Sequence, residues 1–172
     1  PLEWLAGTHQ VPVIRTPGWR LLSDSTPIIS YLDTLSPQPP LHGAGEQGVL
    51  IRVVEEWLDE WLPRVVIHYR WNFPECAAPA GAAIARETLP FAPAGVRRAL
   101  AGGVATWGLK ACRALGVDTP HQQAAAETEA RRLFEALEAQ LAETRFALGN
   151  RPTAVDATLL GGLRAHFLAD PI

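Results

Sequence analysis

The first part of the chain alternates between short apolar runs and turn-forming residues. Residues 11–15 are a short β-branched run, and residues 20–22, Arg-Leu-Leu, form the returning segment. Between them lies Thr-Pro-Gly-Trp, in which proline presets φ at one position and Gly18 tolerates a positive φ at the next. This pattern predicts a β-hairpin over residues 11–22. Pro12 cannot donate to a strand ladder, so it indicates a strand edge or a cis peptide bond.

The next segment has the period of a helix. Residues 24–27 read Asp-Ser-Thr-Pro, which predicts a helix start with capping residues followed by proline at the first helical position. One apolar face is expected on Ile28, Ile29, Leu32 and Leu35. The proline-rich and glycine-rich stretch that follows predicts a linker over residues 37–46. Because two strands alone are marginal, further strands are expected from residues before Pro1 or from a partner.

From about residue 47 the apolar positions repeat with helical period. The first stripe comprises Leu50, Val54, Trp57, Leu58, Trp61 and Leu62. The acids Glu55, Glu56, Asp59 and Glu60 lie largely opposite, which predicts a solvated face. Pro63 is expected to kink or end this helix, with a second segment over 64–73. The signal fades over residues 76–81 and resumes over 97–115.

Two capping boxes predict the last helices. Thr119-Pro120-His121-Gln122 has the threonine and glutamine of a capping box, with proline at the first helical position. Thr153-Ala154-Val155-Asp156 has the same spacing, with aspartate in the acidic role. The second box predicts a helix that carries Leu159, Leu160, Leu163 and Phe167.

Composition and charge exclude several functions. The 172 residues are 48% hydrophobic, which is ordinary for a globular chain, and carry a net charge of −3. This balance favours neither a nucleic-acid partner nor an anionic membrane surface. No segment is long and apolar enough for a membrane span, and the N-terminus does not resemble a signal peptide. Cys76 and Cys112 form no metal motif, and we expect buried, inert thiols, no metal and a cytoplasmic location.

Three motifs together resemble the glutathione S-transferase family. Residues 10–13, Gln-Val-Pro-Val, are similar to the family's strand with a cis-proline. Residues 24–32, Asp-Ser-Thr-Pro-Ile-Ile-Ser-Tyr-Leu, resemble its acidic-residue and serine signature with the helix behind it. Residues 146–157 resemble its buried capping box. Their order and spacing also fit, and the Arg- and Ala-rich composition suggests a bacterial member.

The resemblance implies an α+β fold. Residues 1–36 would be the C-terminal part of a thioredoxin-like domain, and residues 47–172 an all-α helical-bundle domain. The family's catalytic Tyr, Ser or Cys lies in a first βαβ unit, which would precede Pro1, so we assign no catalytic residue. The resemblance implies glutathione as co-substrate, bound by Val11, Pro12, Asp24 and Ser25.

The resemblance also implies a pocket for a small hydrophobic electrophile between the two domains. Tyr69, Arg70 and Trp71 are candidates to line it, with aromatic walls and one polar anchor. The alternative is that the tryptophans fill the core and that Arg70 pairs with a surface acid.

Two functions follow from these expectations. The first is a glutathione-dependent transferase, usually a homodimer, that conjugates or reduces small electrophiles. The second is a non-catalytic binding or dimerisation module with the same fold, because fold alone does not fix function.

Overall fold

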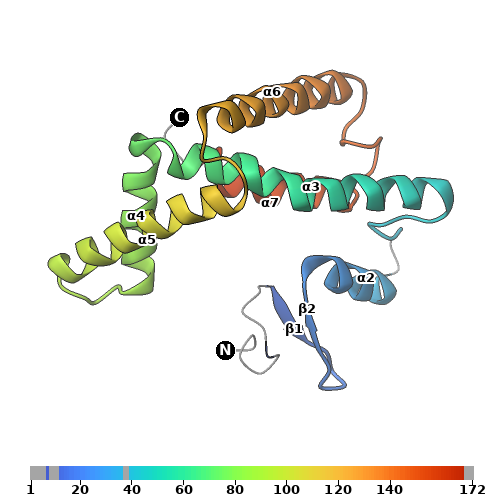
Figure 1. The fold of residues 1–172 in the computed structure, drawn as a ribbon. Coiled ribbons are helices and arrows are strands. Elements are labelled where there is room, and N and C mark those ends of the chain that lie inside the picture. Colours follow the sequence, from blue (N-terminus) through green and yellow to red (C-terminus); the bar gives the residue numbers. More distant parts are fainter. Residues whose placement is uncertain (1–6, 8–11, 37–38, 169–172) are drawn as a thin grey trace.

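A computed structural model describes residues 7, 12–36 and 39–168. A short hairpin and one helix come first, and long helices make up the rest of the described chain (Figure 1). This arrangement agrees with the helical domain expected from the sequence.

The hairpin consists of β1 (Val13–Arg15) and β2 (Leu21–Ser23), which pair antiparallel with Ile14 opposite Leu22. The predicted hairpin is therefore confirmed. The positive φ, however, belongs to Trp19, with φ 63°, and not to Gly18. The Trp19 N–H donates to the Thr16 carbonyl at 3.0 Å, so Trp19 closes the turn in the left-handed conformation. The Arg15 guanidinium lies 4.1 Å from the centre of the Trp19 ring and covers it.

Helix α2 (Ser25–Leu35) begins within the predicted capping segment, but Pro27 is its third residue, whereas the sequence predicts it as the first. Asp24 is its N-cap, and its carboxylate accepts a hydrogen bond from the Thr26 N–H. Ile28 is buried and Ile29 packs against the main core, as expected for the apolar face. Leu32 and Leu35 are exposed instead, because no described residue covers that part of the helix.

Helix α3 (Gly45–Trp71) runs past Pro63 without ending, so the prediction of two helical segments is wrong. A proline inside a helix removes one backbone hydrogen bond and is costly by itself. Here the turns on both sides of Pro63 are held by packing, since Leu62, Val65 and Val66 are all buried. Tertiary contacts therefore outweigh the local preference to stop.

The buried face of α3 is also rotated from the predicted stripe. Ile51, Leu58 and Leu62 are buried, whereas Leu50 and Trp57 are exposed. Glu56, Asp59 and Glu60 are solvated as expected. Glu55 is only 1% exposed, so its assignment to the solvated face is wrong. The face is rotated because α3 packs against α7, α6, α5 and α4 on several sides, and Glu55 is buried against Thr26 and His42.

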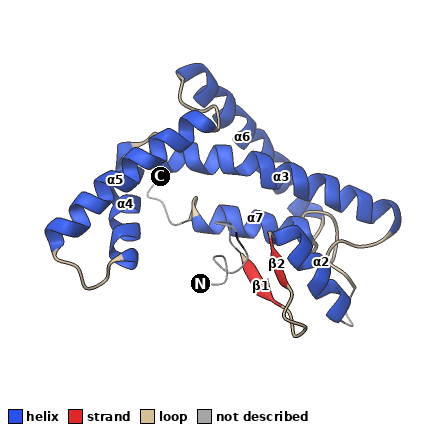
Figure 2. Ribbon diagram, turned by 60° about the horizontal axis from the view of Figure 1, so that its bottom comes forward, coloured by secondary structure: helices blue, strands red, loops and turns tan. Residues whose placement is uncertain are grey.

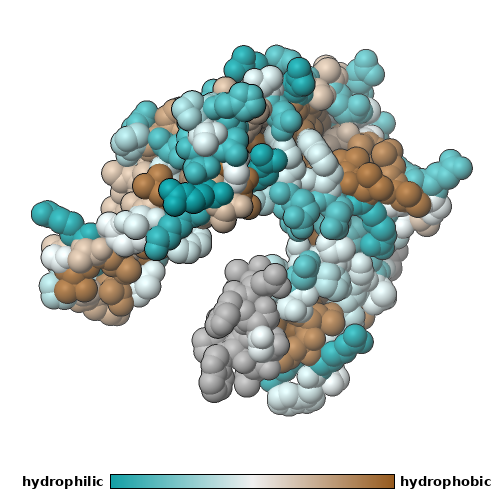
Figure 3. All heavy atoms as spheres, in the orientation of Figure 1, coloured by the Kyte–Doolittle hydropathy of each residue, from teal (hydrophilic) through white to brown (hydrophobic). Residues whose placement is uncertain are grey.

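Helices α4 (Pro74–Thr88) and α5 (Ala94–Ala114) form a hairpin that projects from the C-terminal part of α3 (Figures 1 and 2). The sequence pattern missed α4, which is rich in alanine and has no wide apolar stripe. Small residues let the two helices approach closely, since a Cβ on Gly81 would lie 3.0 Å from the Ala101 carbonyl oxygen. Hydrophobic atoms gather at the free end of this hairpin and over the N-terminal half of α3 (Figure 3).

Helices α6 (Pro120–Glu143) and α7 (Ala154–Ala165) begin at the two predicted capping boxes. The Gln122 N–H donates to the Thr119 hydroxyl, and the Gln122 side chain accepts from the Thr119 N–H at 3.2 Å. The second box is buried: the Asp156 carboxylate accepts from the N–H groups of Ala147 and Thr153, both at 2.8 Å. Both predictions are confirmed.

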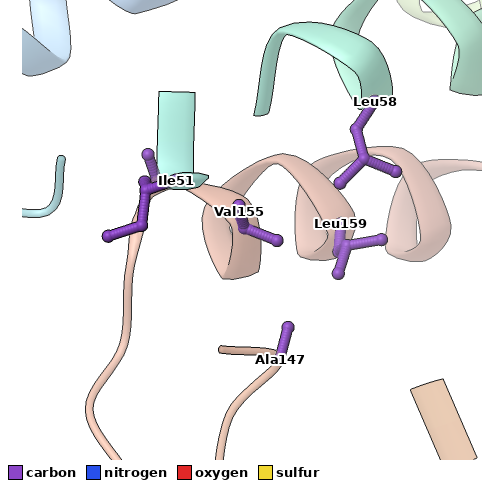
Figure 4. Close-up of a cluster of buried hydrophobic side chains, with 6 residues drawn as sticks. Ile51, Leu58, Ala147, Val155 and Leu159 are labelled. Atoms are coloured by element: carbon purple, nitrogen blue, oxygen red, sulfur yellow. The ribbon is translucent and has the colours of Figure 1, made fainter. Parts of the chain in front are cut away.

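The main core lies where α7 packs along α3. Its buried members are Ile51, Leu58, Ala147, Ala154, Val155 and Leu159 (Figure 4). A second cluster lies near the base of the α4–α5 hairpin and contains Trp71, Cys112, Val117 and Ala126. A Cβ on Gly108 would overlap the Trp71 indole, so this position needs glycine for the close approach of α5 to α3.

Candidate functional site

The entrance to β1 and the N-terminus of α2 meet at one place. The Asp24 N–H donates to the Pro12 carbonyl at 3.3 Å, although twelve positions separate the two residues in the chain. This bond brings together three of the four predicted glutathione ligands, namely Pro12, Asp24 and Ser25. The fourth, Val11, lies outside the described residues.

Asp24 has an unusual backbone, with φ 80° and ψ 142°. Residues other than glycine are strained at positive φ, and such strain concentrates at functional sites. The carboxylate turns back to accept the Thr26 N–H at 3.0 Å. The Ser25 hydroxyl makes no hydrogen bond with any described residue, and it stands at the positive end of the helix dipole. This helix end is therefore suited to hold a carboxylate.

Asp59 on α3, whose side chain is exposed, is coupled electrostatically to Asp24 at this helix end. Burial raises the pKa of the Asp59 carboxyl, and the negative charges of Asp24, Glu55, Glu60 and Glu56 raise it further. The negative charge of Asp24 is thus close enough to Asp59 to disfavour its ionised form. A ligand ammonium placed between them would relieve this repulsion.

A buried polar bridge fastens α2 to α3 directly beneath the site. The Thr26 hydroxyl donates to Glu55 Oε1 at 3.0 Å, and Glu55 Oε2 lies 3.6 Å from His42 Nε2. Glu55 is 1% exposed and His42 is 2% exposed. Burying such groups is costly unless they are paired, so the bridge fixes the orientation of the first turn of α2.

The expected linker holds part of this bridge. The Asp33 carboxylate accepts the N–H groups of Leu41 and His42 at 2.9 and 3.2 Å. The Leu41 carbonyl accepts the Ala154 N–H at 3.1 Å. Sequence reasoning missed His42 and Glu55 because a histidine in a proline-rich stretch and an acid among other acids give no local signal of burial.

The three predicted pocket residues have separate surroundings. Trp71 is 5% exposed and packs in the second core cluster, which is the alternative considered for the tryptophans. Tyr69 packs against the rings of His68, Phe73 and Phe167. Burial raises the pKa of the Tyr69 hydroxyl; nearby Glu127 raises it further and Arg131 lowers it. Arg70 donates from Nη2 to the Ala165 carbonyl at 2.6 Å, near the end of α7.

A groove that the sequence did not predict lies between α3 and α6. It has a volume of about 490 Å³, and the walls are Trp57, Trp61, Arg64, Glu129, Arg132, Leu133 and Ala136. The rings of Trp57 and Trp61 stack with centroids 5.1 Å apart, and Trp61 Nε1 donates to Glu129 at 2.7 Å. The groove is on the α6 side of α3, whereas Asp59 is on the α2 side.

The two cysteines are buried, as expected. Burial raises the pKa of the Cys112 thiol; a backbone hydrogen bond lowers it by less, and nearby Asp118 adds a smaller increase. A thiol with a raised pKa is a poor nucleophile at neutral pH. Within the ranges the structure describes, no three His, Cys, Asp or Glu side chains are grouped to hold a metal ion. None of the described helices has the length and apolar character needed to cross a membrane.

Comparison with known families gives one match. Residues 120–163, which span α6 and most of α7, match the family model described as glutathione S-transferase, C-terminal domain. The match includes the buried capping box at Thr153 and Asp156. No curated protein and no solved structure matches the chain significantly. The match supports a glutathione S-transferase-like family and agrees with the mostly helical fold.

Proposed function

We propose that this protein binds glutathione at the N-terminus of α2 and acts as a glutathione-dependent transferase on small hydrophobic electrophiles. The observation that carries the proposal is the hydrogen bond from Asp24 to Pro12. It sets a helix N-terminus, with a serine hydroxyl, beside an extended segment. Glutathione has a carboxylate and an ammonium at one end and an extended peptide backbone, which are the groups such a place can bind.

Each group of glutathione has a matching partner in this arrangement. The γ-glutamyl carboxylate would accept hydrogen bonds from the Ser25 hydroxyl and the first-turn N–H groups of α2. The γ-glutamyl ammonium would lie between Asp24 and Asp59, whose pKa is raised by burial and by neighbouring acids. The cysteinyl backbone would pair with Val11 as an added strand.

The proposed reaction transfers the glutathione sulfur to carbon. The thiol loses its proton, the thiolate forms a bond to an electrophilic carbon, and the leaving group departs with the electron pair. Proximity alone contributes much of such catalysis when both reactants are held in place. The residues named here bind and orient glutathione, and we assign the proton transfer to none of them.

Arg70 is the residue best placed to meet the second substrate. It lies eleven positions after Asp59, which puts the two on one side of α3 about 16 Å apart along the axis. Its guanidinium already contacts the end of α7, and its side chain could anchor a polar group of the electrophile. Tyr69 and Trp71, which are its packed neighbours on either side in the sequence, would hold this turn of α3 in place.

A homodimer is part of the proposal, and one observation also favours the alternative of a dimerisation module. Val49, Val53 and Trp57 recur at every fourth position of α3 and are 64%, 61% and 48% exposed. A stripe of exposed apolar residues along one helix is typical of an interface. The hydrophobic gathering over this half of α3 is visible in Figure 3.

Calorimetric titration with reduced glutathione tests the proposed site. We expect saturable binding that weakens about tenfold in Ser25→Ala, because a hydrogen bond to a charged group is removed. Thr34→Ala is the matched control, since it removes a hydroxyl from the last turn of the same helix. Absence of binding in the full-length protein would overturn the transferase proposal. Equal affinities of the two variants would place glutathione elsewhere.

A further inference from the structure

The free end of the α4–α5 hairpin exposes apolar side chains that no described residue covers. Phe91 is 99% exposed, Val96 50% and Leu89 38%. Single exposed apolar residues are common, but three within eight positions at the end of a projecting hairpin form a patch. The patch lies far from α2 and outside the residues matched by the transferase family (Figures 1 and 3).

The loop that carries Phe91 is held in one conformation. The Leu89 N–H donates to the Ala85 carbonyl at 3.1 Å, and the Ala92 N–H donates to Leu89 at 3.2 Å. Arg97 Nη1 donates to the Pro90 carbonyl at 3.4 Å. Proline stands on either side of Phe91 and its neighbour, at positions 90 and 93. Phe91 is therefore presented to solvent by an ordered loop, so little conformational entropy is lost when it is buried against a partner.

Three arginines surround the base of this patch. Arg86, Arg97 and Arg98 line a groove of about 460 Å³ between α4 and α5, with Ala78, Ala82, Ala94 and Ala101 as its other walls. None of the three forms an ion pair with a described residue. Glu87 is the single acid between positions 86 and 98, so this segment carries a charge of three minus one, or +2.

These arginines do not serve the stability of α5. Arg97 and Arg98 lie near its N-terminus, where basic residues oppose the helix dipole. The helix has no side-chain cap and no acid in its first turn. The positive charge near this end therefore exceeds the negative charge of Glu87, and the excess complements an anionic partner.

We propose that the end of the α4–α5 hairpin docks on an anionic phospholipid bilayer. Phe91, Leu89 and Val96 would enter the interfacial region, and the three arginines would contact the headgroup phosphates. Arg86 lies two residues before the end of α4, and Arg97 three residues after the start of α5. They are thus about 3–5 Å behind the loop along the helix axes. This offset would place the arginines at the level of the headgroup phosphates when the Phe91 side chain is inserted shallowly into the interfacial region.

The whole-chain charge of −3 argues against an anionic surface only as an average. Surface attraction falls off within a Debye length of about 8 Å, so the charges nearest the bilayer decide. At this end of the molecule they are positive. Docking here leaves the α2 end of the molecule away from the bilayer.

Vesicle co-sedimentation of the full-length protein tests the proposal. We expect binding to mixed phosphatidylcholine–phosphatidylglycerol vesicles and at least tenfold weaker binding to pure phosphatidylcholine. Phe91→Ser should weaken binding roughly tenfold, because a buried aromatic ring is lost. Arg98→Ala should weaken it about fivefold, as expected for one basic residue at an anionic surface. Added salt should weaken binding of the unmodified protein.

Controls separate docking from misfolding and from other partners. Leu160→Ser and Arg113→Ala remove an exposed leucine and an exposed arginine elsewhere, and both should bind like the unmodified protein. Absence of vesicle binding would overturn the proposal, as would equal binding to both vesicle types. If the unmodified protein binds no vesicles but forms oligomers, and Phe91→Ser dissociates them, the patch binds a second copy of this chain and docking on a bilayer is overturned. If the protein binds inorganic phosphate but no vesicles, the groove between α4 and α5 is a site for small anions, and docking on a bilayer is overturned.

Discussion

Asp24 stands at positive φ, a backbone region that is costly for any residue with a Cβ. Such strain costs about 1–3 kcal/mol and persists only where the surroundings enforce it. Here the Pro12 carbonyl holds its N–H, and the Thr26 N–H holds its carboxylate. The strain keeps the first turn of α2 turned toward the β1 entrance. A glycine at this position would relieve the strain and lose the cap.

Asp59→Asn tests the acidic part of the proposed site. The folded-state pKa of Asp59 is raised above its ordinary value of 3.8, so stability falls as pH rises from there through the raised pKa. At pH 7 the ionised carboxylate of Asp59 therefore lowers the stability of the folded protein. Asp59→Asn should raise the free energy of unfolding by less than about 1 kcal/mol. The gain should vanish below pH 3.8.

The same variant should bind glutathione about fivefold more weakly, as expected for losing one solvent-screened charge pair. Urea unfolding at several pH values, with calorimetry at pH 7, measures both effects. If Asp59→Asn binds glutathione as tightly as the unmodified protein, Asp59 takes no part in glutathione binding, and the proposed role of Ser25 is unaffected.

Glu55→Ala probes the buried bridge. The change removes the acceptor of the Thr26 hydroxyl, and a hydroxyl left unsatisfied costs about 1–3 kcal/mol. It also removes the carboxylate 3.6 Å from the buried His42 Nε2, an atom that has no hydrogen-bond partner among the described residues. We expect lower stability in urea and weaker glutathione binding, because the first turn of α2 loses its support. Thr26→Val removes the same hydrogen bond but keeps the Glu55–His42 pair, so it should lose less stability. Equal losses would show that His42 takes no part.

At the scale of elements, the starts of the capped helices could be predicted, and the buried faces of the helices only in part. The caps at Asp24, Thr119 and Thr153 are local chemistry, so the sequence alone locates them. The continuation of α3 past Pro63 and the burial of Glu55 depend on residues distant in sequence. Helix α4 escaped prediction because alanine and glycine can pack closely without an apolar stripe.

The two capping boxes should differ in their contribution to stability. Asp156 accepts hydrogen bonds from two backbone N–H groups and from the Thr153 hydroxyl, and Thr153 is 1% exposed. Asp156→Ala should lower the free energy of unfolding by about 3 kcal/mol, whereas Thr119→Ala at the exposed box should cost about 1 kcal/mol. Chemical denaturation of both variants checks this. Similar costs would mean that the buried box adds nothing beyond capping.

At the scale of the whole molecule, several contacts tie the strand-bearing part and the linker to the helical part, among them two hydrogen bonds and the packing of Ile29 on the main core. The Thr26–Glu55 bond joins α2 to α3, and the Leu41–Ala154 bond joins the linker to α7. The two motifs marked Pro12, Asp24 and Ser25 as candidate ligands, and the structure brings Asp24 to Pro12 through one backbone hydrogen bond; that they bind glutathione stays a prediction. The motifs did not predict Glu55, His42 and Asp59, which reach the site only through packing between parts.

Val53→Glu tests the proposed homodimer. Val53 is 61% exposed in the apolar stripe of α3, and a buried charge there would oppose association. Light scattering after size exclusion should show a dimer for the unmodified protein and a monomer for this variant. Leu160→Glu, on the exposed side of α7, should leave the dimer intact. A monomeric unmodified protein would refute this part of the proposal.

The stacked pair Trp57 and Trp61 also gives the protein a built-in optical signal. Two indoles whose centroids lie 5.1 Å apart, with planes inclined by 8°, couple their strongest electronic transitions, which contributes a paired band to the far-ultraviolet circular dichroism. The pair borders both the exposed stripe of α3 and the groove facing α6. Association of two copies, or a ligand in that groove, would change the angle between the rings and hence the band. Events on this helix can therefore be followed without attaching any label.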